Sequence, residues 1–154
     1  MYRIPIYKVS LVRESSIPSE SRQIKSSTDI VQMLRDYLDE VDREHFIIVM
    51  LDSKNKLIGI HTVSVGSLTS SLVHPREVFK PICLSNAAAV ILAHNHPSGD
   101  PMPSQEDIAI TNRLRRCGEF MGIRILDHIV LGDGTGKHIS MLDNGYWEDL
   151  KPTN

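Results

Sequence analysis

Residues 87–107 read AAAVILAHNHPSGDPMPSQED, and this stretch decides the fold because it leads from a buried strand through a rigid loop into a helix. Its first seven residues are apolar without polar alternation, which is typical of a strand covered on both faces. Side chains two apart on a strand point the same way, so His94 and His96 can converge on one point while Asn95 faces the other side. The prolines and glycine of residues 97–103 cannot continue a central strand, and they predict a turning loop.

A helix is predicted after this loop. Residues 105–114 place apolar side chains at helical spacing, with Ser104 as the natural N-cap. Ser104 and Asp107 form the Ser-x-x-acid pattern of a capping box, and alone this pattern predicts no more than a cap. The two histidines add a second interpretation. Two imidazoles and a carboxylate are three ligands with an open fourth position, as in catalytic zinc sites, whereas structural zinc is closed by four ligands.

A zinc-activated water also needs a general base beside it. Sequence physics alone does not choose among the upstream acids, although Glu44 has the merit of directly preceding a predicted strand, where a sheet presents side chains to a cleft. The alternative for each acid is a solvated surface carboxylate. The candidates are Glu40, Asp42, Glu44, Asp52 and Glu77.

The spacing of these residues resembles a known metal signature. His94-x-His96, seven residues, Ser104, two residues and Asp107 is similar to the motif of the JAMM (MPN+) metalloprotease superfamily, and HNHPSGDPMPS resembles its RadC-like branch. Further agreement with that branch comes from REHF at residues 43–46, VHPREVF at 73–79 and LDHIVLG at 126–132. The resemblance covers residues 27–145.

This resemblance implies a zinc hydrolase. It implies that His94, His96 and Asp107 hold Zn²⁺, that Glu44 is the catalytic base with Glu77 in reserve, and that Ser104 donates to the oxyanion. It implies an amide substrate, a peptide or isopeptide bond in a protein or peptide. The implied fold is α/β, a mixed β-sheet sandwiched by helices with JAMM/cytidine-deaminase-like architecture, which the interleaving of predicted strands and helices also favours.

The remaining elements follow from hydrophobic period and turn residues. Residues 1–13 predict an edge strand or an arm, since Pro5 removes a ladder donor, and residues 14–27 predict a linker. We therefore expect a strand or arm with its linker over residues 1–26 and one domain over residues 27–154. The other predicted elements are helix 28–41 capped by Ser27 or Thr28, strands 46–51 and 57–65, a helix from Pro75 that Pro81 bends or shortens, closure of the 105–114 helix by Gly118 or Gly122, strand 123–131, a hairpin turn at 132–136 and a short strand at 138–142.

Several other reactive residues are expected to be structural. Histidines are often partly buried without a ligand role, so His45, His61, His74, His128 and His138 are predicted to be surface or core groups. His128 is the one that could support the metal site from behind, since metal-binding histidines use their second nitrogen in a hydrogen bond. Asp100 is expected to be a turn residue rather than a metal ligand. Cys83 and Cys117 have no CxxC spacing and are predicted to be reduced core residues.

Composition narrows the function classes. The 154 residues include 41% hydrophobic and 23% charged side chains, which suits one globular domain with a core of its own. A formal net charge of −2 gives no electrostatic footprint for nucleic acid. No signal peptide and no membrane-spanning run of about 18 apolar residues is seen, so a cytoplasmic protein without membrane association is expected.

Three alternatives to the hydrolase remain open. They are a metal-dependent nuclease or DNA-repair factor, as the family label suggests, a DNA-associated accessory protein, and a non-catalytic scaffold of the kind that JAMM relatives without the metal motif form. Many RadC-like proteins carry a helix-hairpin-helix DNA-binding domain before this one, and we expect this chain to lack it. The letters HNH are not taken as an HNH nuclease, whose residues are spread over a longer unit. Substrate identity and oligomeric state are not predicted.

Overall fold

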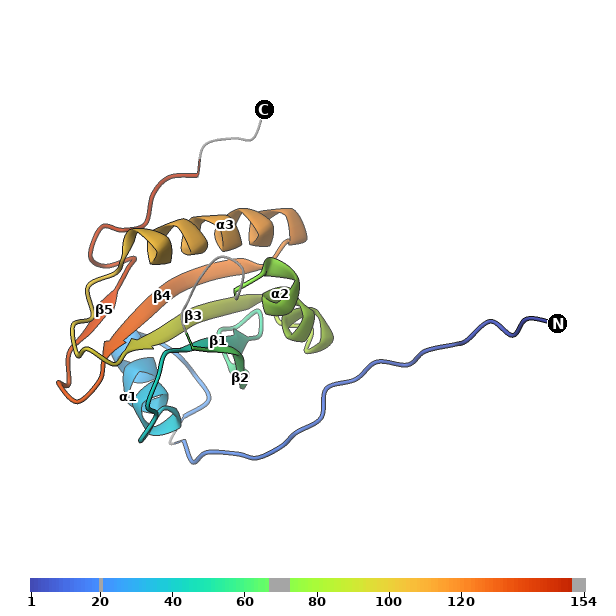
Figure 1. Ribbon diagram of the computed structural model, residues 1–154, viewed down its shortest axis with the longest axis horizontal. Coiled ribbons are helices and arrows are strands. Elements are labelled where there is room, and N and C mark those ends of the chain that lie inside the picture. The colour runs from blue at the N-terminus through green and yellow to red at the C-terminus, as the bar shows by residue number, and fades with distance from the viewer. Residues whose placement is uncertain (20, 67–72, 151–154) are drawn as a thin grey trace.

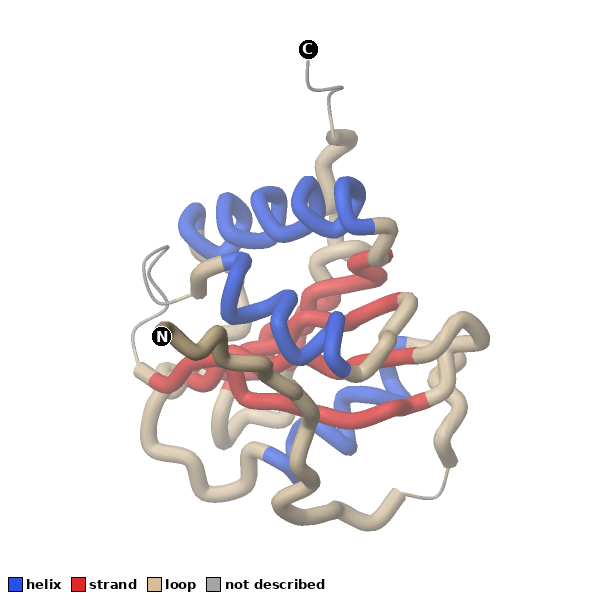
Figure 2. Tube along the Cα trace, turned by 90° about the vertical axis from the view of Figure 1, so that its right-hand side faces the viewer, coloured by secondary structure: helices blue, strands red, loops and turns tan. Residues whose placement is uncertain are grey.

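The computed structural model of the protein describes residues 1–19, 21–66 and 73–150. In this part of the chain, a mixed sheet is flanked by helices on both faces (Figures 1 and 2). The strand order is β2-β1-β3-β4-β5, in which β3 and β4 are parallel and all other neighbours are antiparallel. The elements are α1 (Ser27–Tyr37), β1 (His45–Leu51), β2 (Leu57–Val65), α2 (Pro75–Leu84), β3 (Ala89–His96), α3 (Gln105–Met121), β4 (Arg124–Gly132) and β5 (His138–Ser140).

The sheet separates two hydrophobic layers, which confirms the predicted α/β fold. On one face, the side chains of β1 and β3 that include Phe46 and Leu92 pack with α2 and α3. On the other face, alternate residues such as Ile47 and Ile91 pack against α1. Every residue of β3 up to Asn95 is buried, as expected of a central strand without polar alternation.

The crossover from β3 through α3 to β4 positions the functional site. Parallel neighbours need a long connection, and α3 provides it across one face of the sheet (Figure 1). His94 is opposite Phe46 of β1 on one side and Val130 of β4 on the other. The carboxyl end of β3 therefore lies next to the N-terminus of α3, a place where α/β sheets commonly bind ligands.

Helix ends differ from the prediction in detail. The cap of α1 is Ser26, one residue before the two predicted, because its hydroxyl and the Asp29 carboxylate form a reciprocal capping box. This helix ends at Tyr37 rather than at residue 41, and Glu40 follows with a positive φ of 58°. α3 closes at Gly122, which has φ 69°, and the alternative Gly118 lies within the helix, where a Cβ would come 2.5 Å from the Ile123 carbonyl oxygen.

Two further predictions need correction. Residues 1–13 form no strand, and side chains such as Ile6 and Tyr7 are exposed, so the edge-strand alternative is wrong. The cysteines are free as predicted, but the core prediction is wrong for Cys83, which is exposed on α2, whereas Cys117 of α3 is half-buried and packs against the core. The domain boundary between residues 26 and 27 stays a prediction. The last four residues of the predicted domain, 151–154, lie outside the described part of the chain.

None of the helices in the described ranges is both long and apolar enough to cross a membrane.

Candidate metal centre

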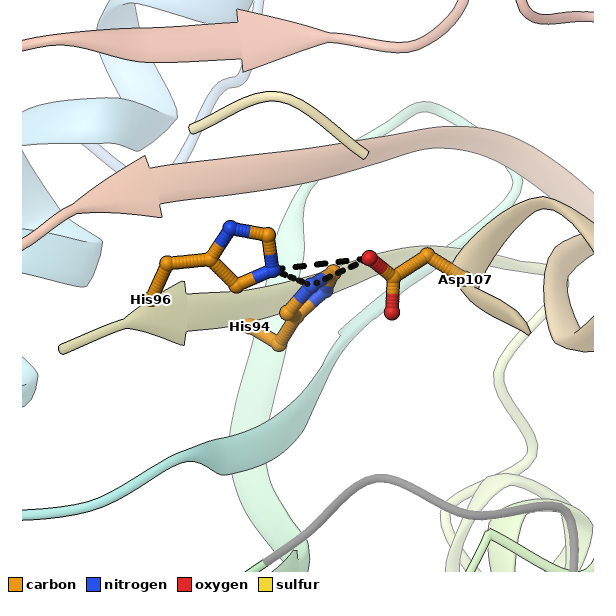
Figure 3. A group of neighbouring side chains, drawn as sticks. All are labelled: His94, His96 and Asp107. Carbon is orange, nitrogen blue, oxygen red and sulfur yellow. Dashed lines mark hydrogen bonds and ion pairs between the residues drawn. The ribbon is translucent and has the colours of Figure 1, made fainter. Parts of the chain in front are cut away.

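His94, His96 and Asp107 converge at the junction of β3 and α3 (Figure 3). Their nearest ligand atoms lie within 4.8 Å of one another. The Nε2 atoms of the two imidazoles are 2.9 Å apart, and Asp107 Oδ2 lies 3.4 Å from each of them. The structure therefore brings together the three residues that the sequence spacing selected.

Asp107 has both of the roles considered for it. It is the third residue of α3, its backbone N–H donates to Ser104 Oγ at 3.1 Å, and its Oδ2 accepts the Ser104 N–H at 2.8 Å. This capping box fixes the carboxylate at the helix N-terminus. The same Oδ2 faces both imidazoles, so the cap orients the candidate ligand rather than competing with it.

A backbone carbonyl sets the proton position on His96. Its Nδ1 is 2.7 Å from the Asp100 carbonyl oxygen, and because a carbonyl only accepts, Nδ1 must carry the proton. Neutral His96 then presents a lone pair on Nε2 toward His94 and Asp107. The Asp100 carboxylate accepts the Met102 N–H at 3.0 Å, so Asp100 serves the turn, as predicted, and its carbonyl orients the histidine.

A buried chain of hydrogen bonds sets the proton position on His94. Thr111 donates its one hydroxyl proton to the Asp107 carbonyl oxygen at 2.6 Å, so toward His128 Nδ1, also at 2.6 Å, it accepts. His128 thus carries its proton on Nδ1, and its Nε2 accepts from His94 Nδ1 at 2.7 Å. Burial, with His94 next, holds the pKa of His128 well below its usual value, so it is neutral.

The result is two imidazole lone pairs that point at each other. Such lone pairs repel at 2.9 Å unless a proton or a metal cation lies between them. The hydrogen bond with Asp107 raises the pKa of His96, against the opposing effect of its burial. Burial disfavours ionised Asp107, but hydrogen bonding to the protonated forms of His94 and His96 outweighs this effect and holds the pKa of that carboxyl far below its usual range. The cluster of His94, His96 and Asp107 therefore favours a bound proton or a metal cation.

Glu44 lies at the edge of this site. It directly precedes β1, and continuing the antiparallel register Phe46–His94 by two residues places Glu44 opposite His96. It is half-buried, and its charge is among the smaller causes that raise the pKa of His96. The reserve candidate, Glu77, instead forms an exposed ion pair with Lys80 on α2, with Oε2 2.9 Å from Nζ.

Sequence reasoning missed Thr111, which lies within the helix predicted over residues 105–114 and was given no role of its own there. The available signal was its spacing, because a residue four positions after Asp107 stacks on the same helical face. Among the other histidines, His74 caps α2 by accepting the Arg76 N–H at 3.0 Å, and His45 Nδ1 lies 2.9 Å from the Arg43 carbonyl oxygen. Both have the structural roles predicted for them.

Comparisons with known proteins agree with this geometry. Residues 24–146 match the sequence model of the RadC-like JAB domain. The chain is 47% identical over 133 residues to a UPF0758 protein of Caldanaerobacter subterraneus, covering 86% of the chain and 56% of that relative. It is 56% identical over 111 residues to a UPF0758 protein of Moorella thermoacetica, covering 72% and 48%. The chain thus spans about half the length of the curated relatives it matches.

The mixed sheet, the flanking helices and the His-His-Asp cluster define a domain of the JAB/MPN superfamily. Within that superfamily, the chain belongs to the RadC-like JAB domain family.

Proposed function

We propose that this protein is a zinc-dependent hydrolase that cleaves a peptide or isopeptide bond. The observation that carries the proposal is the convergence of two oriented imidazole nitrogens and one carboxylate beside Glu44. The donor set fits zinc, because imidazole nitrogens suit Zn²⁺ while magnesium and calcium prefer sites built from oxygen atoms. Three protein ligands also leave room for a water molecule and a substrate.

The metal would be held by His94, His96 and Asp107. A bound zinc ion supplies Lewis acidity, which lowers the pKa of a water molecule toward about 7 and polarises a carbonyl group. His94 is fully buried, whereas His96 is partly open and Ser104 is exposed. A substrate therefore approaches from the side of His96 and Ser104.

Two side chains supply the proton chemistry. Glu44, across from His96, accepts the proton of the attacking water as a general base and can then pass it to the leaving amine. Ser104 uses its hydroxyl as an acceptor in the cap of α3, so its own proton is available to the oxygen that becomes negative on the carbonyl. A donor placed in this way stabilises the transition state more than the substrate.

The test is a substrate screen with metal-loaded and metal-stripped protein. Linear peptides, lysine-linked isopeptides and single- and double-stranded DNA are incubated with each form, together with the variant His94→Ala. Amide cleavage that requires both zinc and His94 supports the proposal. Cleavage of DNA alone would replace it with a nuclease, and the absence of any cleavage with one zinc bound per chain would favour a scaffold.

A further inference from the structure

Asn95 lies between the two histidines of the metal centre, yet it points away from them because successive strand side chains alternate. It is completely buried, and its amide makes three hydrogen bonds. Its Oδ1 accepts the backbone N–H of His45 at 2.7 Å, and its Nδ2 donates to the Arg43 carbonyl oxygen at 3.0 Å and to Asp133 Oδ2 at 2.6 Å. Both amide protons are therefore used.

Two of these three bonds bracket Glu44. Arg43 precedes Glu44 and His45 follows it, so the amide of Asn95 forms hydrogen bonds with the backbone on either side of the candidate base. The backbone ladder between β1 and β3 ends at the pair Phe46–His94. The side chain of Asn95 extends the connection beyond that pair, at the point where the register places Glu44 opposite His96.

The opposite ends of this arrangement are also fixed. The Glu44 carbonyl oxygen accepts the Gly66 N–H at 2.8 Å, which ties the segment to the end of β2. Asp133, in the turn between β4 and β5, donates its backbone N–H to the His96 carbonyl oxygen at 3.1 Å while its carboxylate binds Asn95. The start of β1 and the end of β3 are thus held in one hydrogen-bonded unit that also includes the β4–β5 turn.

We propose that Asn95 is a positioning residue that holds Glu44 at the distance from the metal centre needed for proton transfer. This inference rests on the proposed function, in which Glu44 is the general base. A misplacement of about 1 Å in a catalytic group can reduce turnover roughly 100-fold. Asn95 acts through the backbone of residues 43–45 and touches neither the metal nor the substrate.

The kinetic test compares Asn95→Ala with Glu44→Gln and with the double variant. Asn95→Ala should lower kcat about 10- to 100-fold with KM changed less than about twofold and zinc affinity unchanged. In the Glu44→Gln background, the same change should cost less than about twofold further, because a residue that acts through Glu44 has nothing left to position. Independent, multiplicative losses would overturn the proposal, as would a parallel loss of zinc.

A second readout does not depend on activity. Hydrogen exchange followed by NMR should show the His45 amide exchanging at least about tenfold faster in Asn95→Ala, while the Leu92 amide in the centre of β3 keeps its parent rate. The matched control is Ser140→Ala on β5, which removes a buried hydrogen bond to Asp127 of β4, far in sequence from residues 43–45. It should lose stability but leave kcat and the His45 amide unchanged. An unchanged exchange rate of the His45 amide in Asn95→Ala would refute the proposal that Asn95 holds this segment in place.

A swap variant tests the chemistry of the contact. Asn95→Asp places a carboxylate against Asp133 and should inactivate the protein at least as strongly as Asn95→Ala. Adding Asp133→Asn restores a donor opposite the new acceptor, and turnover should recover by several-fold. No recovery would contradict the role of this hydrogen bond. If Glu44→Gln retains full activity while removal of zinc abolishes activity, the assignment of Glu44 as the base is wrong. The exchange measurement then still tests whether Asn95 holds residues 43–45 in place.

Discussion

Replacement of Thr111 by valine tests the hydrogen-bond chain behind the metal centre. Valine keeps the shape of threonine but removes the oxygen that accepts from His128 Nδ1 at 2.6 Å. Thr111 is 1% exposed and His128 is fully buried, so water does not replace the lost partner. A buried donor without an acceptor costs about 1–3 kcal/mol, which for a domain of this size lowers Tm by roughly 3 to 9 °C.

The stability lost in Thr111→Val can be regained in part only by a proton shift that weakens metal binding. If His128 moves its proton to Nε2, that proton points at His94 Nδ1, 2.7 Å away, and His94 must then carry its own proton on Nε2. This is the nitrogen that faces His96 and Asp107. Disturbing the partner of a metal-binding histidine typically lowers affinity about 10- to 100-fold, and we expect Thr111→Val to do so.

The assay is zinc competition against a chromophoric chelator, with thermal unfolding of the metal-free protein measured in parallel. Thr111→Ser is the matched control, because it keeps the hydroxyl and should bind zinc within about twofold of the parent. Parent-like zinc affinity in Thr111→Val, together with lower stability, would show that the hydroxyl is only structural and would refute the assigned proton positions.

The other predictions concern the ligands, the base and DNA. Glu44→Gln should keep zinc and lose about 10²- to 10⁴-fold in turnover, whereas Glu77→Gln should cost little; the reverse result would move the base to α2. Asp107→Asn should weaken zinc binding but keep the helix content of the metal-free protein, since asparagine also caps helices; unchanged affinity would leave Asp107 a cap only. The raised pKa of His96 means that protonated His96 stabilises the metal-free fold. This stabilisation is fully present when the pH is below the ordinary pKa of 6.5, and it is lost as the pH rises through the pKa of the folded state. The difference in Tm between the parent protein and His96→Gln should therefore shrink with rising pH. DNA binding should be weak, and submicromolar, salt-sensitive binding near physiological ionic strength would return the DNA alternatives to first place.

The sequence predicted the parts of the site that depend on local geometry. His94 and His96 share a strand face because strand side chains repeat every two residues, and Asp107 reaches them because the Ser104 cap fixes where α3 begins. The long apolar runs of β1 and β3 likewise indicated a buried sheet. Metal binding by His94, His96 and Asp107 stays a prediction, which rests on the chemistry of these side chains and on the family.

Element ends were predicted less well, for a physical reason. Helix 28–41 stops at Tyr37, and Ser26 rather than Ser27 caps it, since neighbouring serines have equal intrinsic capping ability and the Asp29 carboxylate decides between them. The alternating apolar residues of the N-terminal segment predicted an edge strand as readily as an arm. Pairing partners, which sequence period does not contain, decided the outcome.

The sequence by itself determined a buried central strand, a capped helix after it, and three candidate ligands at their junction, because these features depend on contacts within about fifteen residues. Only the tertiary structure decided what surrounds those ligands. His128 meets His94 across 34 residues of sequence, and Asn95 meets the Arg43 carbonyl across 52. Both contacts follow from strand order, since β3 lies between antiparallel β1 and parallel β4. Proton positions and the placement of Glu44 depend on that order, which no local pattern encodes.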